Sequence, residues 1–319
     1  MAKVDIFNGD ADGICSLLQL RQAEPCDSRL VTGVKRDIAL VEQASIAAGD
    51  DVVVLDISFD KNRVGVVDAL DKGARILYVD HHFAGGIPQH DNLQAIINTA
   101  SDVCTSLLIN SYLSGRYCEW AITGAFGDNL NRGAEALAKT TELTSAQLQQ
   151  LASLGVYLNY NGYGATLEDL HFTPAALFDR LRHYASPLDF IADDVATFDC
   201  LEAGYQQDMA TAAALSATIE SDVAAVFTLP NEKWARRVGG VYSNDLANAH
   251  PDRAHAVLTE KTNGSYLVSV RAPLNNKTGA DEVVRQFETG GGRKAAAGIN
   301  ELPATDLARF IDVLTNFYR

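Results

Sequence analysis

The sequence predicts an α/β protein with an N-terminal doubly wound parallel sheet domain and a smaller C-terminal α/β domain. Short runs rich in valine and isoleucine recur near the N-terminus, and each is followed by a segment with helical periodicity. Strands that alternate with helices indicate a parallel sheet that helices cover on both faces. The length of 319 residues exceeds the usual size of one hydrophobic core, so two domains are expected.

Four apolar runs are expected to form the first sheet. They are KVDIF (3–7), DVVVLD (51–56), ARILYVD (74–80) and LQAII (93–97). Helices are expected from near Gly13, over residues 60–73 and from about residue 102 to residue 113. In the second of these helices, Val64, Val67, Ala69 and Leu70 are expected to form the buried face.

The rest of the chain is expected to be helical first and then mixed. Helical patterns dominate from about residue 119 to residue 218, and strand patterns return at 224–229, 236–242, 254–260 and 265–272. Further helices are expected over 281–288 and 304–318. The predicted division is a first domain over 1–205, a linking helix over 206–222 and a second domain over 223–319.

Composition and charge exclude several classes of protein. The chain is 47% hydrophobic and 21% charged, as in globular proteins, and no apolar run approaches the roughly 18 residues of a membrane span. We expect no signal peptide, and five cysteines without a CxxC pair argue against disulfides and zinc fingers. A cytoplasmic protein is expected. The net charge of −15 favours a small anionic ligand over long nucleic acid, which needs a basic track.

Acidic and imidazole side chains follow three of the expected strands. They are Asp10, Asp12, Asp56, Asp80, His81 and His82. Asp128, after an apolar stretch with two glycines, is a fourth position. Ligands of open α/β sheets bind at the carboxyl ends of the strands, and several carboxylates there would repel one another without cations. Pairs of divalent ions roughly 3.5–4 Å apart are common in enzymes that cleave phosphate esters.

Each of these residues has a simpler explanation when it is taken alone. Asp10 and Asp12 are ordinary choices for a loop or a helix N-cap. The run NGDADG also fits the start of a calcium loop, but Gln19 stands where that loop needs glutamate, and a strand precedes it instead of a helix. The pattern as a whole, and adjacent histidines after a strand-ending aspartate above all, favours a metal site.

These motifs resemble those of the DHH phosphoesterase superfamily. The likeness lies in D-x-D after the first strand, a strand-ending aspartate, D-H-H and a later aspartate. ASDVCTSLLI (100–109) resembles the family's Ser/Thr-rich segment, and VSVRA (268–272) its arginine-bearing strand. FETGGGRKAAAGIN (287–300) resembles the glycine-rich signature of the DHH-associated C-terminal domain. The resemblance covers nearly the whole chain and implies an active site in the cleft between the domains.

The resemblance implies a site with two divalent ions, manganese first, with magnesium, cobalt or iron as alternatives. Asp10 would bind one ion, Asp12 the other, and Asp56 would bridge them. The shell of the second ion would be completed by His81 and Asp128. A histidine ligand of the first ion is implied at the position of Asn8, where an amide is a weak or absent ligand.

It also implies how substrate is held and attacked. His82 would face the substrate phosphate, and Asp80 would orient the histidine pair. In the second domain the glycines 290–292 (Gly290, Gly291 and Gly292) would bring backbone N–H groups to an anion. Arg271, Arg293 and Lys294 would supply positive charge. Arg293 stands where the family signature continues with histidine, which leaves the mode of nucleotide recognition open.

The implied function is hydrolysis of short nucleotides by a manganese-dependent phosphodiesterase or phosphatase. Oligoribonucleotides, linear or cyclic dinucleotides and 3′-phosphoadenosine 5′-phosphate are the substrates considered. A RecJ-type single-strand exonuclease, a polyphosphatase or pyrophosphatase, and a nucleotide-binding protein with weak catalysis remain alternatives. We expect a small nucleotide or short oligonucleotide as partner, with no long duplex nucleic acid and no membrane, and a homodimer is compatible with this.

Overall fold

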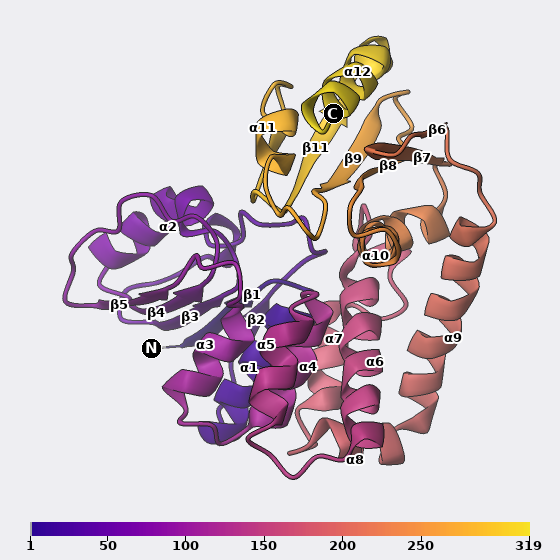
Figure 1. The fold of residues 1–319 in the computed structure, drawn as a ribbon. Coiled ribbons are helices and arrows are strands. Elements are labelled where there is room, and N and C mark those ends of the chain that lie inside the picture. The colour runs from indigo at the N-terminus through magenta and orange to yellow at the C-terminus, as the bar shows by residue number, and fades with distance from the viewer. Residues whose placement is uncertain (1) are drawn as a thin grey trace. The chain divides into compact units, whose positions relative to one another are not determined.

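A parallel sheet with the strand order β2-β1-β3-β4-β5 forms the centre of the first unit (Figure 1). Its strands are β1 (Lys3–Phe7), β2 (Arg29–Val31), β3 (Asp51–Leu55), β4 (Arg75–Asp80) and β5 (Leu93–Ile97). The structure, a computed structural model, describes residues 2–319. The four predicted strands are all present. The short edge strand β2, which has no buried residue, was not predicted.

One face of this sheet packs against helix α2 (Phe59–Asp71) and the 3₁₀ turn η1 (Glu42–Ala44). Val66, Ala69 and Leu70 of α2 are buried in this cluster. Val64 and Val67, which were predicted to be buried, are 72% and 38% exposed. That prediction was wrong because residues 66, 69 and 70 follow the helical repeat of three and four residues, whereas residues 64 and 67 lie on the next face.

The other face is covered by α1 (Ala11–Ala23) and α3 (Thr105–Tyr112). Beyond them lie α4 (Cys118–Gly127), α5 (Asn131–Ala138), α6 (Ser145–Gly162), η2 (Leu167–Asp169), α7 (Pro174–Leu181) and α8 (Pro187–Asp193). Because α1 also contacts α4 and α6, every residue from Ala11 to Leu20 is buried. The start of α1, which carries acidic residues, is therefore held inside the first unit.

The helix that leaves the first unit differs from the predicted linking helix. Helix α9 (Val195–Ala213) starts before residue 206 and ends well before residue 222. After it the chain forms the hairpin of β6 (Ile219–Glu220) and β7 (Ala224–Leu229), and the Thr218 N–H donates to the Val226 carbonyl. The hairpin uses backbone groups that a longer helix would need. The chain divides into two units between Glu202 and Ala203.

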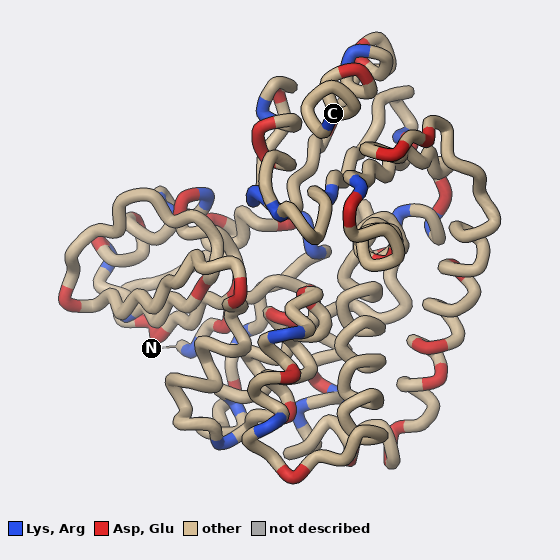
Figure 2. Tube along the Cα trace, in the orientation of Figure 1, with Lys and Arg blue, Asp and Glu red and all other residues tan. Residues whose placement is uncertain are grey.

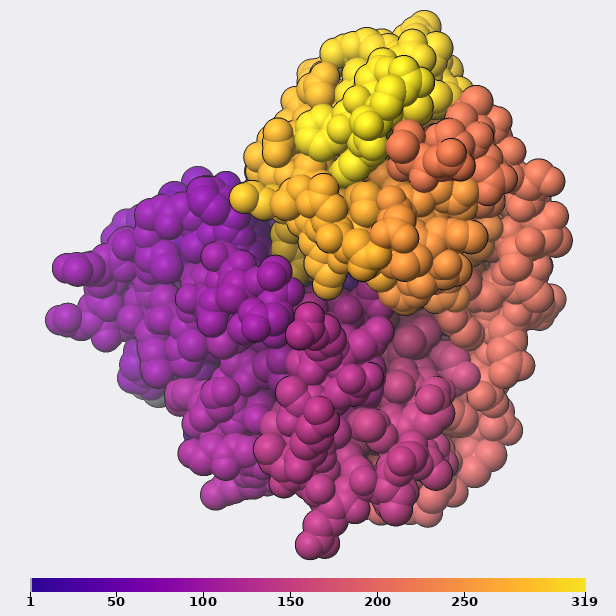
Figure 3. Space-filling model, viewed as in Figure 1, coloured from indigo at the N-terminus to yellow at the C-terminus, as the bar shows by residue number. Residues whose placement is uncertain are grey.

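A mixed sheet with the order β10-β11-β9-β8-β7-β6 forms the second unit. Its other strands are β8 (Ala254–Glu260), β9 (Tyr266–Arg271), β10 (Gly290–Gly292) and β11 (Ala296–Leu302). Helices α11 (Ala280–Val284) and α12 (Leu307–Phe317), the latter after η3 (Ala304–Asp306), supply residues to its core. In the space-filling view the orange and yellow residues of this unit form one packed body (Figure 3).

Helix α10 (Lys233–Ala249) contains residues 236–242, which were predicted to be a strand. That prediction was wrong because the run is buried continuously from Val238 to Ser243, a pattern that suits a strand or a helix, whereas the whole segment of 17 residues has the length of a helix. Helix α10 contacts β8 and β9. The predicted fold class, a parallel sheet domain followed by a smaller α/β domain, is confirmed.

Across residues 2–319, no helix combines the length and the apolar content that crossing a bilayer requires.

One histidine of the second unit should make its stability depend on pH. His255 on β8 is fully buried, and its Nε2 accepts a hydrogen bond of 3.2 Å from Arg253 Nε. Burial, together with Arg253 and His250, lowers the pKa of His255 to about 4. The unfolded chain, whose histidine pKa is about 6.5, binds this proton first as the pH falls. Stability is therefore lost between about pH 6.5 and pH 4.

We expect His255→Gln to lose less stability than the wild-type chain when the pH is lowered from 7 to 4.5, because glutamine keeps an acceptor but binds no proton. Urea unfolding at the two pH values measures this. His183→Gln, which changes an exposed histidine, is the matched control and should follow the wild type. Equal losses in all three proteins would contradict the assignment.

Candidate metal centre

The predicted site residues of the first unit meet at the carboxyl ends of β1, β3 and β4. Asn8 to Asp12 follow β1, Asp56 follows β3, and Asp80 is the last residue of β4. In a sheet of this order, the chain leaves β1 and β3 toward opposite faces, which opens a crevice between their carboxyl ends. Asp128 reaches the same place from the end of α4.

Asp12 is fixed by the first turn of α3. Its two carboxylate oxygens accept hydrogen bonds of 2.8 Å from the backbone N–H groups of Thr105 and Ser106. A carboxylate at a helix N-terminus is stabilised by these unpaired N–H groups and by the helix dipole. The Thr105 hydroxyl donates to Asp56 Oδ1 at 3.1 Å. The Ser/Thr-rich segment thus positions two carboxylates, a role that the sequence analysis had not assigned to it.

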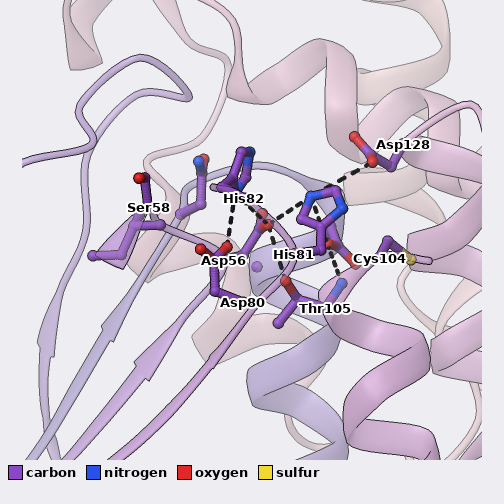
Figure 4. A network of polar contacts seen from close by, with 12 residues as sticks. Asp56, Ser58, Asp80, His81, His82, Cys104, Thr105 and Asp128 are labelled. Carbon is purple, nitrogen blue, oxygen red and sulfur yellow. Dashed lines mark hydrogen bonds and ion pairs between the residues drawn. The ribbon is translucent and has the colours of Figure 1, made fainter. Parts of the chain in front are cut away.

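His81 presents one ring nitrogen to three carboxylates. Its Nδ1 lies 2.9 Å from the Val103 carbonyl, and because a carbonyl only accepts, Nδ1 carries the proton. Nε2 lies 3.4 Å from Asp56 and 3.8 Å from Asp128 (Figure 4). It lies 3.9 Å from Asp12. In the neutral ring Nε2 holds a lone pair. A lone pair that faces several carboxylates is repelled unless a cation lies among them, so this donor set fits a divalent ion.

His82 is turned to a different partner. Its Nδ1 lies 2.7 Å from Asp80 Oδ1, so the proton is on Nδ1 and Nε2 is left for another contact (Figure 4). The side chain is 34% exposed, whereas that of His81 is buried. Ligand atoms of Asp56, His81 and His82 also lie within 4.8 Å of one another, which would suit a shared ion. The short bond to Asp80 favours an orienting role for Asp80 over a ligand role for His82 Nδ1.

The crowding of carboxylates raises the free energy of Asp56 in particular. Burial raises the pKa of Asp56 well above its ordinary value, and Asp12, Asp10, Asp128 and Asp80 raise it further. Its backbone is also in the left-handed region, with φ of 59°, which costs a residue other than glycine some free energy. A cation beside Asp56 would remove the electrostatic part of this cost.

The negative charge of Asp10 is compensated by Lys35, which was not predicted to belong to the site. One of its oxygens accepts from the Gly13 N–H at 3.0 Å and caps α1, and the other pairs with the Lys35 ammonium. Burial alone would raise the pKa of Asp10, but the charge of Lys35 outweighs it and holds this pKa below the usual value. No motif marks Lys35, which lies in a turn between β2 and η1.

Asn8 is buried at the same place. Its Nδ2 donates to the Lys35 carbonyl at 3.3 Å, and its Oδ1 is buried and has no hydrogen-bond partner among the described residues. The amide oxygen is thus an available acceptor. Its predicted role as a weak or absent ligand remains a prediction.

The predicted substrate-binding residues of the second unit lie on β9 and around the β10–β11 hairpin. Arg271 Nε donates to Asn244 Oδ1 at 2.6 Å, and its Nη2 to the Gly240 carbonyl at 3.3 Å. Arg293 and Lys294 are exposed at the hairpin turn.

The three glycines of β10 pair with β11. A Cβ on Gly290 would lie 1.7 Å from the Val284 carbonyl oxygen, and one on Gly292 would lie 2.5 Å from Ala297 Cα. Packing therefore explains Gly290 and Gly292, whereas Gly291 faces open space. Substrate binding by this segment remains a prediction.

No protein-family model and no curated protein sequence matches the chain. Solved structures do match it. The exonuclease RecJ bound to manganese has a TM-score of 0.62 at 16% identity, over 99% of this chain and 90% of that one. The pGpG-specific phosphodiesterase PggH from Vibrio cholerae has a TM-score of 0.57 at 14% identity, over 100% and 99%. CDC45 from Entamoeba histolytica has a TM-score of 0.54 at 9% identity, over 99% and 95%.

At these identities the likeness shows the fold. The chain has the fold of RecJ and of PggH over nearly its full length. The fold expected from the resemblance is thereby confirmed.

We expect Asp56→Asn to stabilise the protein in metal-free buffer, because it removes the most strained of the crowded carboxylates. A gain of about 1 kcal/mol would raise Tm by about 2–4 °C in a domain of this size. The variant should also lose the stabilisation that manganese gives the wild type, since an amide is a poor ligand. Thermal unfolding with chelator and with manganese tests both, with the exposed Asp68→Asn as control. If Asp56→Asn has a lower Tm than the wild type in chelator, the proposed repulsion among the carboxylates is refuted.

Proposed function

We propose that the chain is a metal-dependent phosphoesterase that hydrolyses short nucleotides, with manganese as the preferred ion. The observation that carries this proposal is the position of His81 Nε2 at the carboxyl ends of a parallel sheet. It faces the buried carboxylates of Asp12 and Asp56 and the partly buried carboxylate of Asp128, beside an oriented His82. The fold shared with an exonuclease and with a dinucleotide phosphodiesterase supports the same class of reaction.

Asp12, Asp56, His81 and Asp128 are the residues that would hold the ion. A histidine nitrogen among carboxylate oxygens suits manganese, iron or zinc better than magnesium. A bound divalent ion in such a site lowers the pKa of water and polarises a phosphoryl oxygen. The contacts of Asp12 with α3 and of His81 with Val103 fix the direction of both ligands in advance.

His82 is the residue that we infer to contact the substrate phosphate. Asp80 accepts a hydrogen bond from His82 Nδ1–H. This bond orients the ring and leaves Nε2 to face the substrate. Nε2 can donate a hydrogen bond to a phosphoryl oxygen or pass a proton to the leaving oxygen when the ring is protonated. Asp80 does not touch the substrate in this scheme and acts as a positioning residue.

Charge supports a small substrate. Acidic residues outnumber basic ones by 41 to 26, and the acidic residues are spread over the trace in Figure 2. Arg293 and Lys294 are exposed on the second unit and can bind a nucleotide phosphate. A dinucleotide, a short oligoribonucleotide and 3′-phosphoadenosine 5′-phosphate all fit this pattern. RecJ-type cleavage of long single strands is the second candidate, favoured by the TM-score of 0.62.

We expect the protein with manganese to release mononucleotides from RNA of two to five residues faster than from long single-stranded DNA. The assay compares both at equal concentrations of ends, with cyclic dinucleotide, 3′-phosphoadenosine 5′-phosphate and pyrophosphate in parallel. Faster release from long DNA would favour the exonuclease, and preferred cleavage of pyrophosphate would favour a polyphosphatase. Binding of nucleotide without turnover of any substrate would indicate a sensor and refute the enzyme.

We expect His82→Gln to lower kcat by about 10²–10⁴-fold, the range typical of a lost acid–base group, while manganese affinity and Tm stay unchanged. Asp80→Asn should lower kcat less and shift the pH–rate profile, because it alters the tautomer of His82 and not the metal shell. Steady-state kinetics and calorimetric titration with manganese measure these effects, with the exposed His90→Gln as control. Weaker manganese binding by His82→Gln would instead make His82 a metal ligand.

A further inference from the structure

We propose that the Lys35 ammonium takes the place of one of the two cations, so that this site binds a single divalent ion. The ion would lie among Asp12, Asp56, His81 and Asp128, and Lys35 would supply the second positive charge. This inference rests on the metal site of the proposed function and replaces the expected pair of ions.

The ammonium lies where the expected first ion would bind. Lys35 Nζ pairs with Asp10 Oδ2, donates to Asn159 Oδ1 at 2.9 Å and lies 3.9 Å from Asp128 Oδ1. It also lies 5.3 Å from the centre of the Tyr163 ring, a distance that suits a cation–π contact. Asp10 was expected to bind the first ion, with Asp56 as the bridging ligand. Both of its oxygens are already engaged, one by Lys35 and one by the Gly13 N–H.

The backbone of Lys35 is held in place on both sides. Its N–H donates to the Gly162 carbonyl at 2.7 Å, and its own carbonyl accepts from Asn8 Nδ2 at 3.3 Å. The neighbouring turns approach each other closely, since a Cβ on Gly9 would lie 1.9 Å from the Gly33 carbonyl oxygen. The hydrogen bonds of its backbone therefore hold Lys35 at the site. Asn8 acts here as a support of the lysine turn.

The ion pairs that the described residues make with Asp12 and Asp56 come from histidines and from no lysine or arginine. Asp12 is satisfied by backbone N–H groups, and Asp56 has a hydroxyl and two imidazoles around it. The carboxylates around His81 Nε2 thus retain a place for one divalent ion. A second ion at Asp10 would have to displace the ammonium or bind beside it, and like charges at contact distance repel strongly in a buried site. The geometry therefore favours one ion and one lysine over two ions.

The test counts manganese ions in the full chain without nucleotide. We expect wild type to bind one equivalent in calorimetric titration and to give the spectrum of an isolated Mn²⁺ ion in electron paramagnetic resonance. Lys35→Met keeps the length of the side chain and removes its charge. It should bind a second, weaker equivalent and show a spin-coupled pair. Lys61→Met, which changes an exposed lysine on α2, is the control and should bind one.

The possible outcomes separate the two proposals. Two equivalents with a coupled spectrum in wild type would overturn the role of Lys35, and so would a Lys35→Met protein that keeps its fold and still binds one. No bound manganese in wild type would overturn the metal site on which both proposals rest. Absence of hydrolysis would refute only the enzyme, because the count of ions needs no substrate.

Discussion

Negative charge gathered in one buried place is the constraint on which the first unit depends. The topology brings the carboxyl ends of β1, β3 and β4 together, and each end delivers at least one aspartate. Every buried carboxylate needs a compensating partner. Asp10 forms an ion pair with Lys35, and Asp12 accepts hydrogen bonds from the N-terminus of α3. Asp56 has too little compensating positive charge, and its pKa is raised well above the ordinary value by burial and by its acidic neighbours.

The arrangement of the surrounding elements follows from this need. Helix α1 begins at Ala11, after its N-cap Asp10, and is buried over its first turns, so Asp12 lies in the interior and not on the surface. Helix α3 must then point its first N–H groups at Asp12, which fixes where the segment after β5 enters the helix. The turn with Lys35 must lie against Asn8 and the end of α6. Packing and charge compensation thus use the same contacts.

The sequence was sufficient wherever the contact follows from strand topology. Asp56, Asp80 and His81 were predicted to meet because residues at the ends of neighbouring parallel strands lie at one edge of the sheet. Lys35 could not be predicted, since its partners Asp10 and Asn159 lie 25 and 124 residues away and no pattern joins them. Residues 236–242 were mistaken for a strand because two valines around a pair of glycines suit either element, and only the length of the whole segment, 17 residues, is typical of a helix.

The adjacent residues His81 and His82 have different roles because their Nδ1 atoms have different hydrogen-bond partners. Both rings donate a hydrogen bond from Nδ1–H, His81 to the backbone carbonyl of Val103 and His82 to the carboxylate of Asp80. The acceptor decides where Nε2 points: toward the buried carboxylates for His81, and toward the accessible side for His82. Asp80 is buried with one oxygen on His82, and its other oxygen has no hydrogen-bond partner among the described residues. The hydrogen bond from the His82 ring is therefore the contact that holds this carboxylate.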